Sequence, residues 1–184
     1  MEHNKTGALH LHIGCMYSGK TTSMMVEVDR WRRAAKFTVV ARPALDNRTA
    51  TVTTHAGTVH NGITLTAATL SEIFDELVEY DAIGIDEVQF FPDAIETICR
   101  LVAAGRLVVA SGLDGTFEGK PFPIVGSLIP LADRVEKHSA ICSLCGADAN
   151  FTLRTSTDTE IIVIGGSDKY LAACRACWLA NKRQ

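Results

Sequence analysis

Residues 14–21 read Gly14-Cys15-Met16-Tyr17-Ser18-Gly19-Lys20-Thr21 and match the pattern G-x-x-x-x-G-K-[ST] of a phosphate-binding loop. The run Ala8–Ile13 before this phosphate loop is typical of a strand, and residues 22–35 after it are typical of a helix. Glycines let backbone N–H groups turn toward a phosphate, the helix N-terminus adds the positive end of its dipole, and Lys20 adds a full charge. The sequence therefore predicts a nucleoside triphosphate site, with the Thr21 hydroxyl on Mg²⁺.

The composition is that of an ordinary globular protein. The chain has 184 residues, 21% of them charged and 47% hydrophobic, which gives one core with a small appendage. Its formal net charge of −3 argues against a general partner of nucleic acid or of an anionic membrane. No apolar run reaches the ~18 residues of a membrane span, and the N-terminus lacks the apolar segment of a secretory signal. We therefore expect a cytoplasmic protein in a reducing compartment.

Apolar strands and helices alternate along most of the chain. The predicted strands are 37–41, 82–87 and 107–110, and the predicted helices are 69–80 and 92–105. Residues 44–61 lack periodicity and are predicted to form a long loop, or a loose hairpin around Thr51-Val52-Thr53-Thr54. Nearly continuous apolar strands between helices indicate a parallel sheet covered on both faces. We expect an α/β domain with a phosphate loop over residues 1–133 and a small zinc-binding lobe over residues 134–184, where short β-like pieces and paired cysteines occur.

Two adjacent carboxylates, Asp86 and Glu87, end the predicted strand 82–87. An acidic residue at the end of a buried strand completes a phosphate-loop enzyme, because its carboxylate holds Mg²⁺ directly or through water. Side chains alternate along a strand, so Glu87 can face an acceptor and take the proton from an attacking hydroxyl. An Asp-Glu pair is also common on protein surfaces, and the upstream phosphate loop favours the functional interpretation.

Four cysteines form two pairs, Cys142-x-x-Cys145 and Cys174-x-x-Cys177, separated by residues 146–173. This spacing suits one tetrahedral Zn²⁺, and four protein ligands leave no open position, so the predicted zinc is structural. A redox pair is the alternative, but it is expected singly and near a βαβ unit; cysteines that only pack are the other alternative. A zinc ion here would tie together the ends of a loop with little core of its own.

Three further stretches, Ile83–Asp93, Leu113–Phe122 and Ile164–Tyr170, complete a set of motifs with the phosphate loop and the cysteine pairs. In this order and over nearly the whole chain, the set resembles the small (type II) family of thymidine kinases. The resemblance implies transfer of the γ-phosphoryl group of ATP to the 5′-hydroxyl of thymidine, giving dTMP in nucleotide salvage. It implies deoxyuridine as a further substrate. It further implies a homotetramer and feedback inhibition by dTTP.

The resemblance also implies roles for individual residues. Glu87 takes the general-base position, and a lasso-like lid pinned by zinc closes over the base. The implied ATP and phosphate contacts are Gly14, Cys15, Met16, Tyr17, Ser18, Gly19, Lys20, Thr21, Asp46, Asn47, Arg48, Asp86 and Gln89, with Thr21 and Asp86 at Mg²⁺. The implied nucleoside contacts are Met16, Phe90, Leu113, Phe117, Phe122, Thr152, Ile161, Ile162, Val163, Ile164, Gly165 and Tyr170. An aromatic wall suits a flat base, although Phe117, Phe122 and Tyr170 could instead pack in the core.

Two other functions stay open from the residues alone. A phosphate-loop ATPase or GTPase would use Glu87 to activate water, but the chain has no Asn-Lys-x-Asp guanine signature. A zinc-knuckle module for nucleic acid would use the basic residues of the second lobe, but acidic residues lie among them. The release of ADP with and without thymidine distinguishes the kinase from the ATPase.

Overall fold

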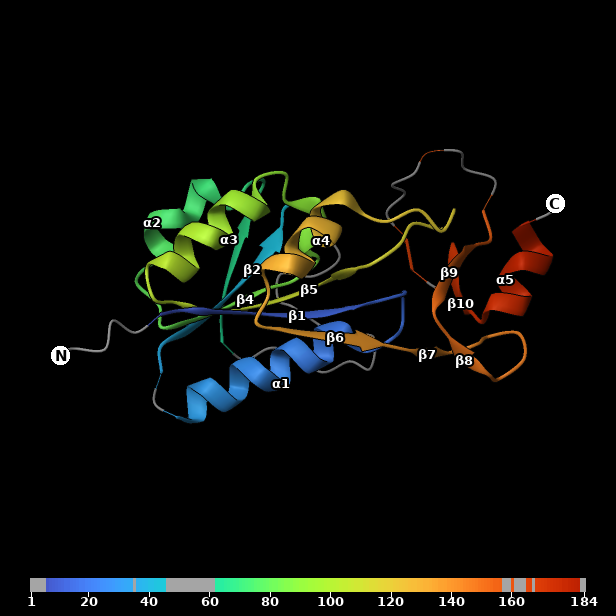
Figure 1. The fold of residues 1–184 in the computed structure, drawn as a ribbon, viewed down its shortest axis with the longest axis horizontal. Coiled ribbons are helices and arrows are strands. Elements are labelled where there is room, and N and C mark those ends of the chain that lie inside the picture. Colours follow the sequence, from blue (N-terminus) through green and yellow to red (C-terminus); the bar gives the residue numbers. More distant parts are fainter. Residues whose placement is uncertain are drawn as a thin grey trace.

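A computed structural model describes residues 6–34, 36–45, 62–156, 160, 165–166 and 168–182. Within these residues the central sheet has strands β1 Ala8–Gly14, β2 Thr38–Pro43, β3 Ile63–Ala67, β4 Ala82–Ile85, β5 Leu107–Leu113 and β6 Arg134–His138. The six strands lie in the order β3-β2-β4-β5-β1-β6, and all neighbours are parallel (Figure 1). The parallel α/β sheet predicted from the apolar strands is therefore confirmed.

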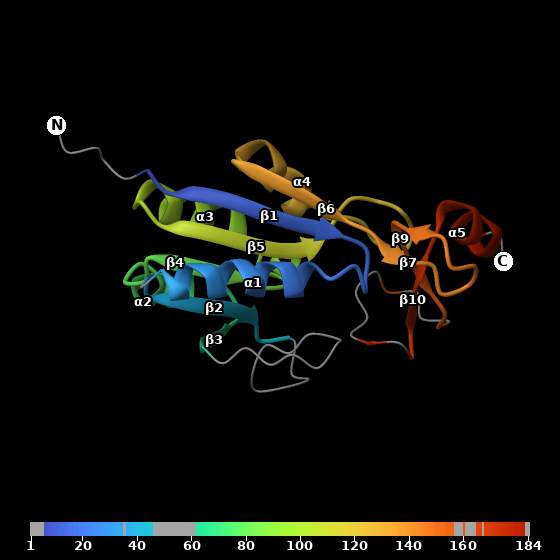
Figure 2. The same ribbon diagram turned by 90° about the horizontal axis from the view of Figure 1, so that it is seen from below.

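Helices cover both faces of this sheet, as parallel strands with helical crossovers require. One face carries α1, and the other carries α2, α3 and α4 (Figure 1); the bounds are α1 Lys20–Arg33, α2 Phe74–Leu77, α3 Ala94–Ala103 and α4 Pro123–Leu128. Short 3₁₀ turns occupy Ser71–Ile73, Val88–Phe90 and Ile129–Leu131. Seen from below in Figure 2, α1 runs along the sheet across β4, between β5 and β2. Among the described residues, no helix is both long enough and apolar enough to cross a membrane.

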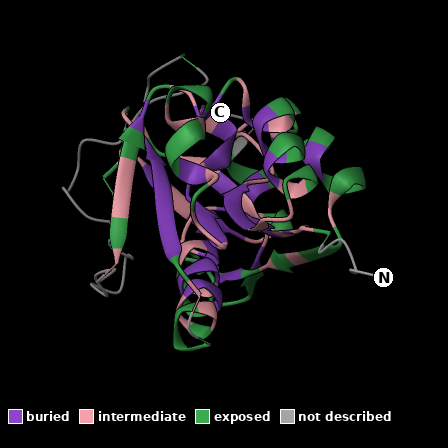
Figure 3. Ribbon diagram, turned by 90° about the vertical axis from the view of Figure 1, so that its left-hand side faces the viewer, coloured by how far each residue is buried: buried purple, intermediate pink, exposed green. Residues whose placement is uncertain are grey.

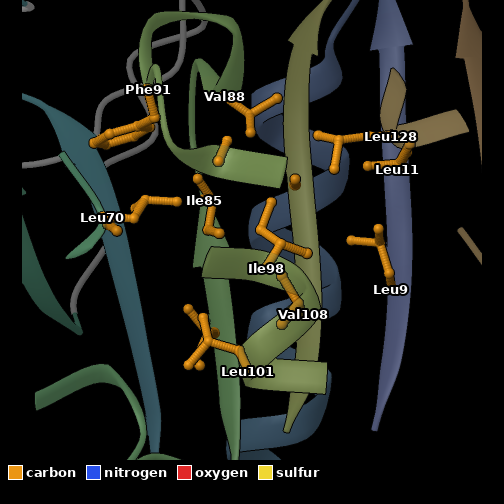
Figure 4. Close-up of a cluster of buried hydrophobic side chains, with 14 of the residues drawn as sticks. Leu9, Leu11, Leu70, Ile85, Val88, Phe91, Ile98, Leu101, Val108 and Leu128 are labelled. Atoms are coloured by element: carbon orange, nitrogen blue, oxygen red, sulfur yellow. The ribbon is translucent and has the colours of Figure 1, made fainter. Parts of the chain in front are cut away.

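The core follows from the alternation of side chains along β1. Leu9 and Leu11 belong to the main apolar cluster, which they share with Ile98 and Leu101 of α3 and Leu128 of α4 (Figure 4). Burying each such side chain contributes about 1.5–3 kcal/mol. Buried residues run along the central strands, whereas the outer sides of the helices are exposed (Figure 3).

On the opposite face, β1 presents polar side chains to α1. A smaller apolar cluster joins Met24 and Val28 of α1 to Val40 and Val109 of the sheet. Beside it, the side chains of β1 that alternate with the apolar set are histidines. The α1 face of β1 is thus chemically different from its α3 face.

The second lobe lies beyond the carboxyl ends of the strands of the sheet (Figure 1). Its elements are β7 Ala140–Ile141, β8 Asp148–Ala149, β9 Phe151–Arg154, β10 Tyr170–Ala173 and α5 Arg175–Lys182. β7 pairs with β8 and β9 with β10, both antiparallel. The β-like pieces expected at 134–140 and 151–154 are strands, and the third, expected at 160–164, lies almost entirely outside the described residues. β6 belongs to the large sheet, although it follows residue 133. The division of the chain into two domains stays a prediction, and the membership of β6 favours a boundary after His138.

The helix predicted at 69–80 is wrong in its extent. A 3₁₀ turn precedes α2, which ends at Leu77. The carboxylate of Asp93 accepts hydrogen bonds from the N–H groups of Leu70 (3.0 Å) and Ser71 (2.7 Å). Glu72 accepts the N–H of Ala68 at 3.2 Å instead of closing a capping box. A side chain from the start of α3 therefore caps this turn, and local spacing does not reveal such a cap.

Several other boundaries differ from the prediction. β3 and α4 have no clear signal in the sequence, because β3 is a partly exposed edge strand and α4 lies in a segment rich in glycine and proline. Pro123 is the first residue of α4. Proline is tolerated there because the N–H groups of the first turn have no acceptor within the helix. α1 begins at Lys20, two residues earlier than expected. The long loop predicted at 44–61 lies almost entirely outside the described residues.

Candidate active site

The phosphate loop joins the carboxyl end of β1 to the start of α1. Gly19 has φ 81°, a left-handed conformation that favours glycine. Gly14 has φ 150°, and a Cβ there would lie 2.4 Å from the carbonyl oxygen of His138 on β6. Tyr17 also has a positive φ of 65°, which for a non-glycine residue costs of order 1–3 kcal/mol. The loop is therefore tightly curved at its centre and close to a neighbouring strand at its start.

Lys20 lies across this loop. Its side chain is buried, and Nζ donates a hydrogen bond of 2.8 Å to the carbonyl oxygen of Cys15. The Ser18 hydroxyl donates to the same carbonyl oxygen, also at 2.8 Å. An ammonium group beside the N-terminus of α1 forms a site that attracts a phosphate.

Cys15 faces the second lobe. Its thiol donates a hydrogen bond of 3.3 Å to the carbonyl oxygen of Ala149, and only 1% of the residue is exposed. Burial raises the pKa of the Cys15 thiol, although the charge of Lys20 acts in the opposite direction. Because the thiolate is the reactive form, this cysteine is shielded from modification.

Asp86 follows β4 directly and lies opposite Thr21 of α1. Its Oδ1 accepts hydrogen bonds from the hydroxyls of Thr21 (2.9 Å) and Ser111 (2.5 Å). Burial, followed by the charge of Glu87, raises the pKa of Asp86 to about 6. A cation next to this carboxylate would offset the cost of burying its charge, and the oxygen donors of Asp86 and Thr21 are of the type that Mg²⁺ prefers. The residues present therefore fit a magnesium ion.

Glu87 lies outside β4, which ends at Ile85 rather than at 87 as predicted. Its backbone is left-handed, with φ 50°, so a turn rather than strand alternation directs its side chain. Gln89 Nε2 lies 2.5 Å from Glu87 Oε2, and Gln89 Oε1 accepts the N–H of Leu113 at 3.1 Å. Gln89, which the family resemblance assigns to ATP, is buried and holds the Glu87 carboxylate.

Hydrogen bonds connect the phosphate loop to the second lobe. The N–H of Met16 donates to Thr152 Oγ1 at 3.1 Å, and the Tyr17 hydroxyl donates to the carbonyl oxygen of Tyr170 at 3.2 Å. Met16, Thr152 and Tyr170 are three of the predicted nucleoside contacts. The structure therefore brings together residues that are far apart in the sequence.

Arg154 joins two of the predicted aromatic contacts. Its guanidinium carbon lies 3.8 Å from the centre of the Phe117 ring, and its Nη2 donates a hydrogen bond of 2.9 Å to the Tyr170 hydroxyl. The indole N–H of Trp178 donates to the carbonyl oxygen of Phe117 at 3.0 Å. Sequence reasoning did not place Arg154 or Trp178 at the site. Arg154 lies two residues after Thr152 on a strand, so alternation along β9 was the signal that could have found it.

The four paired cysteines come together in the second lobe. Their sulfur atoms all lie within 4.8 Å of one another, and the Sγ atoms of Cys145 and Cys174 are 3.6 Å apart. A disulfide would bring two sulfurs to about 2.05 Å. Four sulfurs at about 2.3 Å from one tetrahedral zinc ion lie about 3.8 Å apart. The cluster has the geometry of a single metal site.

The comparisons with known proteins agree on one family. The Thymidine kinase family profile matches residues 7–178. The thymidine kinase of vaccinia virus (strain Ankara) is 39% identical over 176 residues, which are 95% of this chain and 98% of that protein. The thymidine kinase of myxoma virus (strain Lausanne) is 40% identical over 173 residues, which are 94% of this chain and 96% of that protein. The chain belongs to the thymidine kinase family.

A solved structure supports the fold independently of this relationship. The flagellar accessory protein FlaH from Methanocaldococcus jannaschii superposes with a TM-score of 0.53 at 11% identity, covering 79% of this chain and 76% of FlaH. At this identity the likeness concerns the fold alone. The family resemblance inferred from the motifs is confirmed by the thymidine kinase profile and the viral relatives.

Of the remaining residues assigned by the thymidine kinase resemblance, some lie within the described residues and the others lie outside them. Phe122 is 8% exposed and belongs to the main apolar cluster, as the packing alternative expects, whereas Phe90 and Leu113 are half-buried at the carboxyl end of the sheet. Other predicted contacts lie outside the described residues, namely Asp46, Asn47, Arg48, Ile161, Ile162, Val163 and Ile164. Gly165 lies just after the last of these.

Proposed function

We propose that this member of the thymidine kinase family transfers the γ-phosphoryl group of ATP to the 5′-hydroxyl of thymidine, giving dTMP. The observation that carries the proposal is the Glu87 carboxylate, held by Gln89 and adjacent in the chain to Asp86, which is bonded to Thr21. In-line transfer requires a proton acceptor beside the groups that bind phosphate and metal. Membership of the family supplies the acceptor substrate, since the viral relatives are named thymidine kinases.

The residues of the phosphate loop and of the strand ends have separate tasks in this reaction. Lys20 and the N–H groups at the start of α1 would bind the β and γ phosphates. When bound between Thr21 and Asp86 with ATP, Mg²⁺ neutralises charge on those phosphates. Glu87 would accept the proton of the 5′-hydroxyl, and Gln89 would keep its carboxylate oriented toward that hydroxyl.

The nucleoside would lie between the phosphate loop and the second lobe. Phe117, which is half-buried, offers an aromatic ring there, and Arg154 lies over that ring and binds the hydroxyl of Tyr170, which is 7% exposed. With its hydroxyl bonded to Met16, Thr152 has a methyl group left for an apolar contact with a base. Deoxyuridine, which lacks only the methyl group of thymine, would then be a second substrate.

We also propose that the four-cysteine cluster holds a structural zinc ion, which pins a lid formed by the connection from β9 to β10. The sulfur geometry supports the zinc ion. The family resemblance supports a homotetramer, feedback inhibition by dTTP, and a cytoplasmic enzyme with neither nucleic acid nor membrane as a partner. In this proposal, residues 1–133 together with β6 form the phosphate site. The remaining residues form the lid.

The test measures ADP and dTMP together in the presence of ATP and Mg²⁺. With thymidine, we expect the two products in equal amounts, and with deoxyuridine we expect ADP with dUMP. Without a nucleoside, ADP release should fall to a small background, because the proposed base Glu87 would act on a sugar hydroxyl rather than on water. Rapid ADP release that does not depend on nucleoside would identify an ATPase and overturn the proposal.

A further inference from the structure

A second group of metal-ligating side chains lies on the α1 face of the sheet, apart from the four cysteines. It consists of His12 on β1 and of Glu136 and His138 on β6. These strands are parallel neighbours, and their register pairs His12 with Glu136 and Gly14 with His138. Since residues two apart on a strand share a face, all three side chains lie on one face at the edge of the sheet. Their donor atoms lie within 4.8 Å of one another.

The separations of these donor atoms suit a single ion. His12 Nδ1 lies 2.9 Å from His138 Nε2 and 3.4 Å from Glu136 Oε2. His138 Nε2 lies 3.9 Å from the same Glu136 oxygen. Nitrogen and oxygen ligands at about 2.0–2.1 Å from an ion lie about 2.9 Å apart at a right angle and about 3.4 Å apart at a tetrahedral angle. Two of the three separations match these values, and the third, 3.9 Å, corresponds to a wider angle at the ion.

The hydrogen bonds around these side chains leave a lone pair on His12 Nδ1, which faces His138 Nε2. His12 Nε2 lies 3.2 Å from Glu27 Oε2, and a carboxylate there takes an N–H. A neutral His12 then has a lone pair on Nδ1, so Nδ1 and Glu136 Oε2 are two acceptors that face one another. A single proton on His138 Nε2 can form a hydrogen bond to only one of these two acceptors. A cation can be bound by His12 Nδ1, Glu136 Oε2 and His138 Nε2 together. The other oxygen of Glu136, Oε1, is bonded to the guanidinium of Arg134.

Glu27 of α1 supports the arrangement from behind. Its Oε1 lies 2.5 Å from His10 Nδ1, and its Oε2 is the oxygen that faces His12. Glu27 is 6% exposed, so a buried carboxylate sets the tautomer and the ring direction of His12. A carboxylate hydrogen-bonded to the outer nitrogen of a ligating histidine is the usual support of a metal site.

We propose that His12, Glu136 and His138 form a second metal site for a divalent ion of the zinc, cobalt and nickel class, with Glu27 as a positioning residue. Two nitrogens among three donors disfavour Mg²⁺ and Ca²⁺, which take oxygen ligands. Three protein ligands leave the remaining positions to water. The side chains of His138 and Glu136 are 20% and 37% exposed, which gives the ion access from solvent.

The ion would fasten the edge strand β6 to β1. β6 leads through Ser139 into β7 and Cys142, and the His138 carbonyl oxygen lies against Gly14. Through Glu27, the same site is connected to α1, whose first residue is Lys20. The proposed site therefore braces the segment that connects the phosphate loop to the cysteine lobe, and it is expected to act on stability rather than as a group that touches substrate.

The test titrates the full chain, after its metal content has been measured, with Co²⁺. We expect one additional equivalent to bind and to raise the melting temperature. The visible spectrum should show d–d bands without the thiolate charge-transfer band that exchange into the cysteine cluster would produce. Excess Mg²⁺ should not displace the added ion.

Variants assign the bound ion to this site. His138→Gln and Glu136→Gln should each weaken Co²⁺ binding by at least ~100-fold, and Glu27→Gln should weaken it by about 10- to 100-fold. Lys137→Gln is the matched control, because Lys137 lies between the two ligands on the same strand, faces the other way and has a 55% exposed side chain bonded to Asp114. It should bind Co²⁺ as the unmodified chain does.

Two results would overturn the proposal. One is the absence of an additional equivalent in the unmodified chain; the cluster would then be a hydrogen-bonded network without a metal. The other is equal affinity in Glu136→Gln, His138→Gln and the Lys137→Gln control. The melting temperature of each variant without added metal shows whether it folds. If His138→Gln does not fold, Glu136→Gln still decides, because that side chain lies at the surface.

Discussion

Gln89 Nε2 lies 2.5 Å from Glu87 Oε2, while Gln89 Oε1 accepts the N–H of Leu113 on β5. Because the amide oxygen is held by a donor, the amide nitrogen must face the carboxylate. Glu87 also has a left-handed backbone, a strained conformation that neighbouring structure must maintain. The proposed general base is therefore positioned by a turn and by one buried side chain.

Replacing this amide tests whether Gln89 acts on Glu87 or on ATP. Gln89→Met keeps the length of the side chain and removes both hydrogen bonds. We expect kcat with thymidine to fall by roughly 10- to 100-fold, since a small displacement of a reacting group has an effect of that size, while the KM for ATP stays nearly constant. Steady-state kinetics would measure both. A raised KM for ATP with an unchanged kcat would instead make Gln89 an ATP contact.

Glu87→Gln removes the proposed base without changing its size. We expect kcat to fall by ~10²-fold or more, because a positioned base contributes at least that much, and ATP binding to persist. Calorimetry with a non-hydrolysable ATP analogue would measure binding, and single-turnover kinetics would measure the chemical step. Glu96→Gln, at an exposed position on α3, is the control. Near-normal turnover in Glu87→Gln would place the base elsewhere.

Trp178→Phe separates the hydrogen bond of Trp178 from its packing. The indole N–H donates to the Phe117 carbonyl oxygen, and the indole stacks on Phe151 at a centroid distance of 4.8 Å. Phenylalanine keeps an aromatic contact and loses a hydrogen bond of about 1 kcal/mol, so we expect the KM for thymidine to rise about 5-fold. The KM for ATP should not change, and an equal rise for both substrates would contradict the placement of Phe117 beside the nucleoside.

Removing one cysteine ligand tests the connection between metal and nucleoside. Cys174 follows β10, where the carbonyl oxygen of Tyr170 accepts the Tyr17 hydroxyl. In Cys174→Ser we expect loss of zinc and a larger rise in the KM for thymidine than in the KM for ATP, because the lobe loosens while the phosphate loop remains. Cys99→Ser, which changes an exposed cysteine on α3, is the control. Zinc loss with an unchanged KM for thymidine would show that the metal and the nucleoside site are independent.

Asp93 links pH to stability. Burial opposes its ionisation, but hydrogen bonds from Ser71 and Leu70 outweigh this and lower the pKa of Asp93. Because the pKa of Asp93 is lower in the folded state, its ionised carboxylate stabilises the fold at pH values above its unfolded-state pKa of about 3.9. This stabilisation is lost as the pH falls through the folded-state pKa. In Asp93→Ala we expect the free energy of unfolding to drop by about 1–2 kcal/mol at neutral pH.

Urea unfolding at neutral and at acidic pH would measure this difference. The gap between Asp93→Ala and the unmodified chain should narrow in acid, where Asp93 is protonated in both the folded and the unfolded state. Asp75→Ala, in the exposed first turn of α2, is the control for a general loss of surface charge. A gap that does not depend on pH would mean that the charge of Asp93 contributes nothing.

The features predicted correctly depend on residues that are close in the sequence. The phosphate loop carries its glycines, its lysine and its hydroxyl within eight consecutive positions, and Asp86 follows the apolar run of β4. Each cysteine pair has the spacing of one metal-binding turn. Such local patterns determine backbone conformation and ligand chemistry together, so the α/β class, the position of the loop between β1 and α1, and the clustering of the four cysteines could be predicted.

Other features depend on contacts between distant elements. The cap that Asp93 places on Leu70 and Ser71 shortens a helix that local propensity extends, because the cap comes from another helix. Arg154 stacks on Phe117 only because β9 and the turn after β5 meet beyond the sheet.

By itself, the sequence determined the alternation of most strands and helices, the glycine-rich loop between β1 and α1, and which side chains bear charge or sulfur. The tertiary structure alone decided that Gln89 holds Glu87, and that His12 lies beside Glu136 and His138. The physical reason is that strand register and side-chain packing set these distances. They depend on the whole folded core rather than on any one stretch of chain.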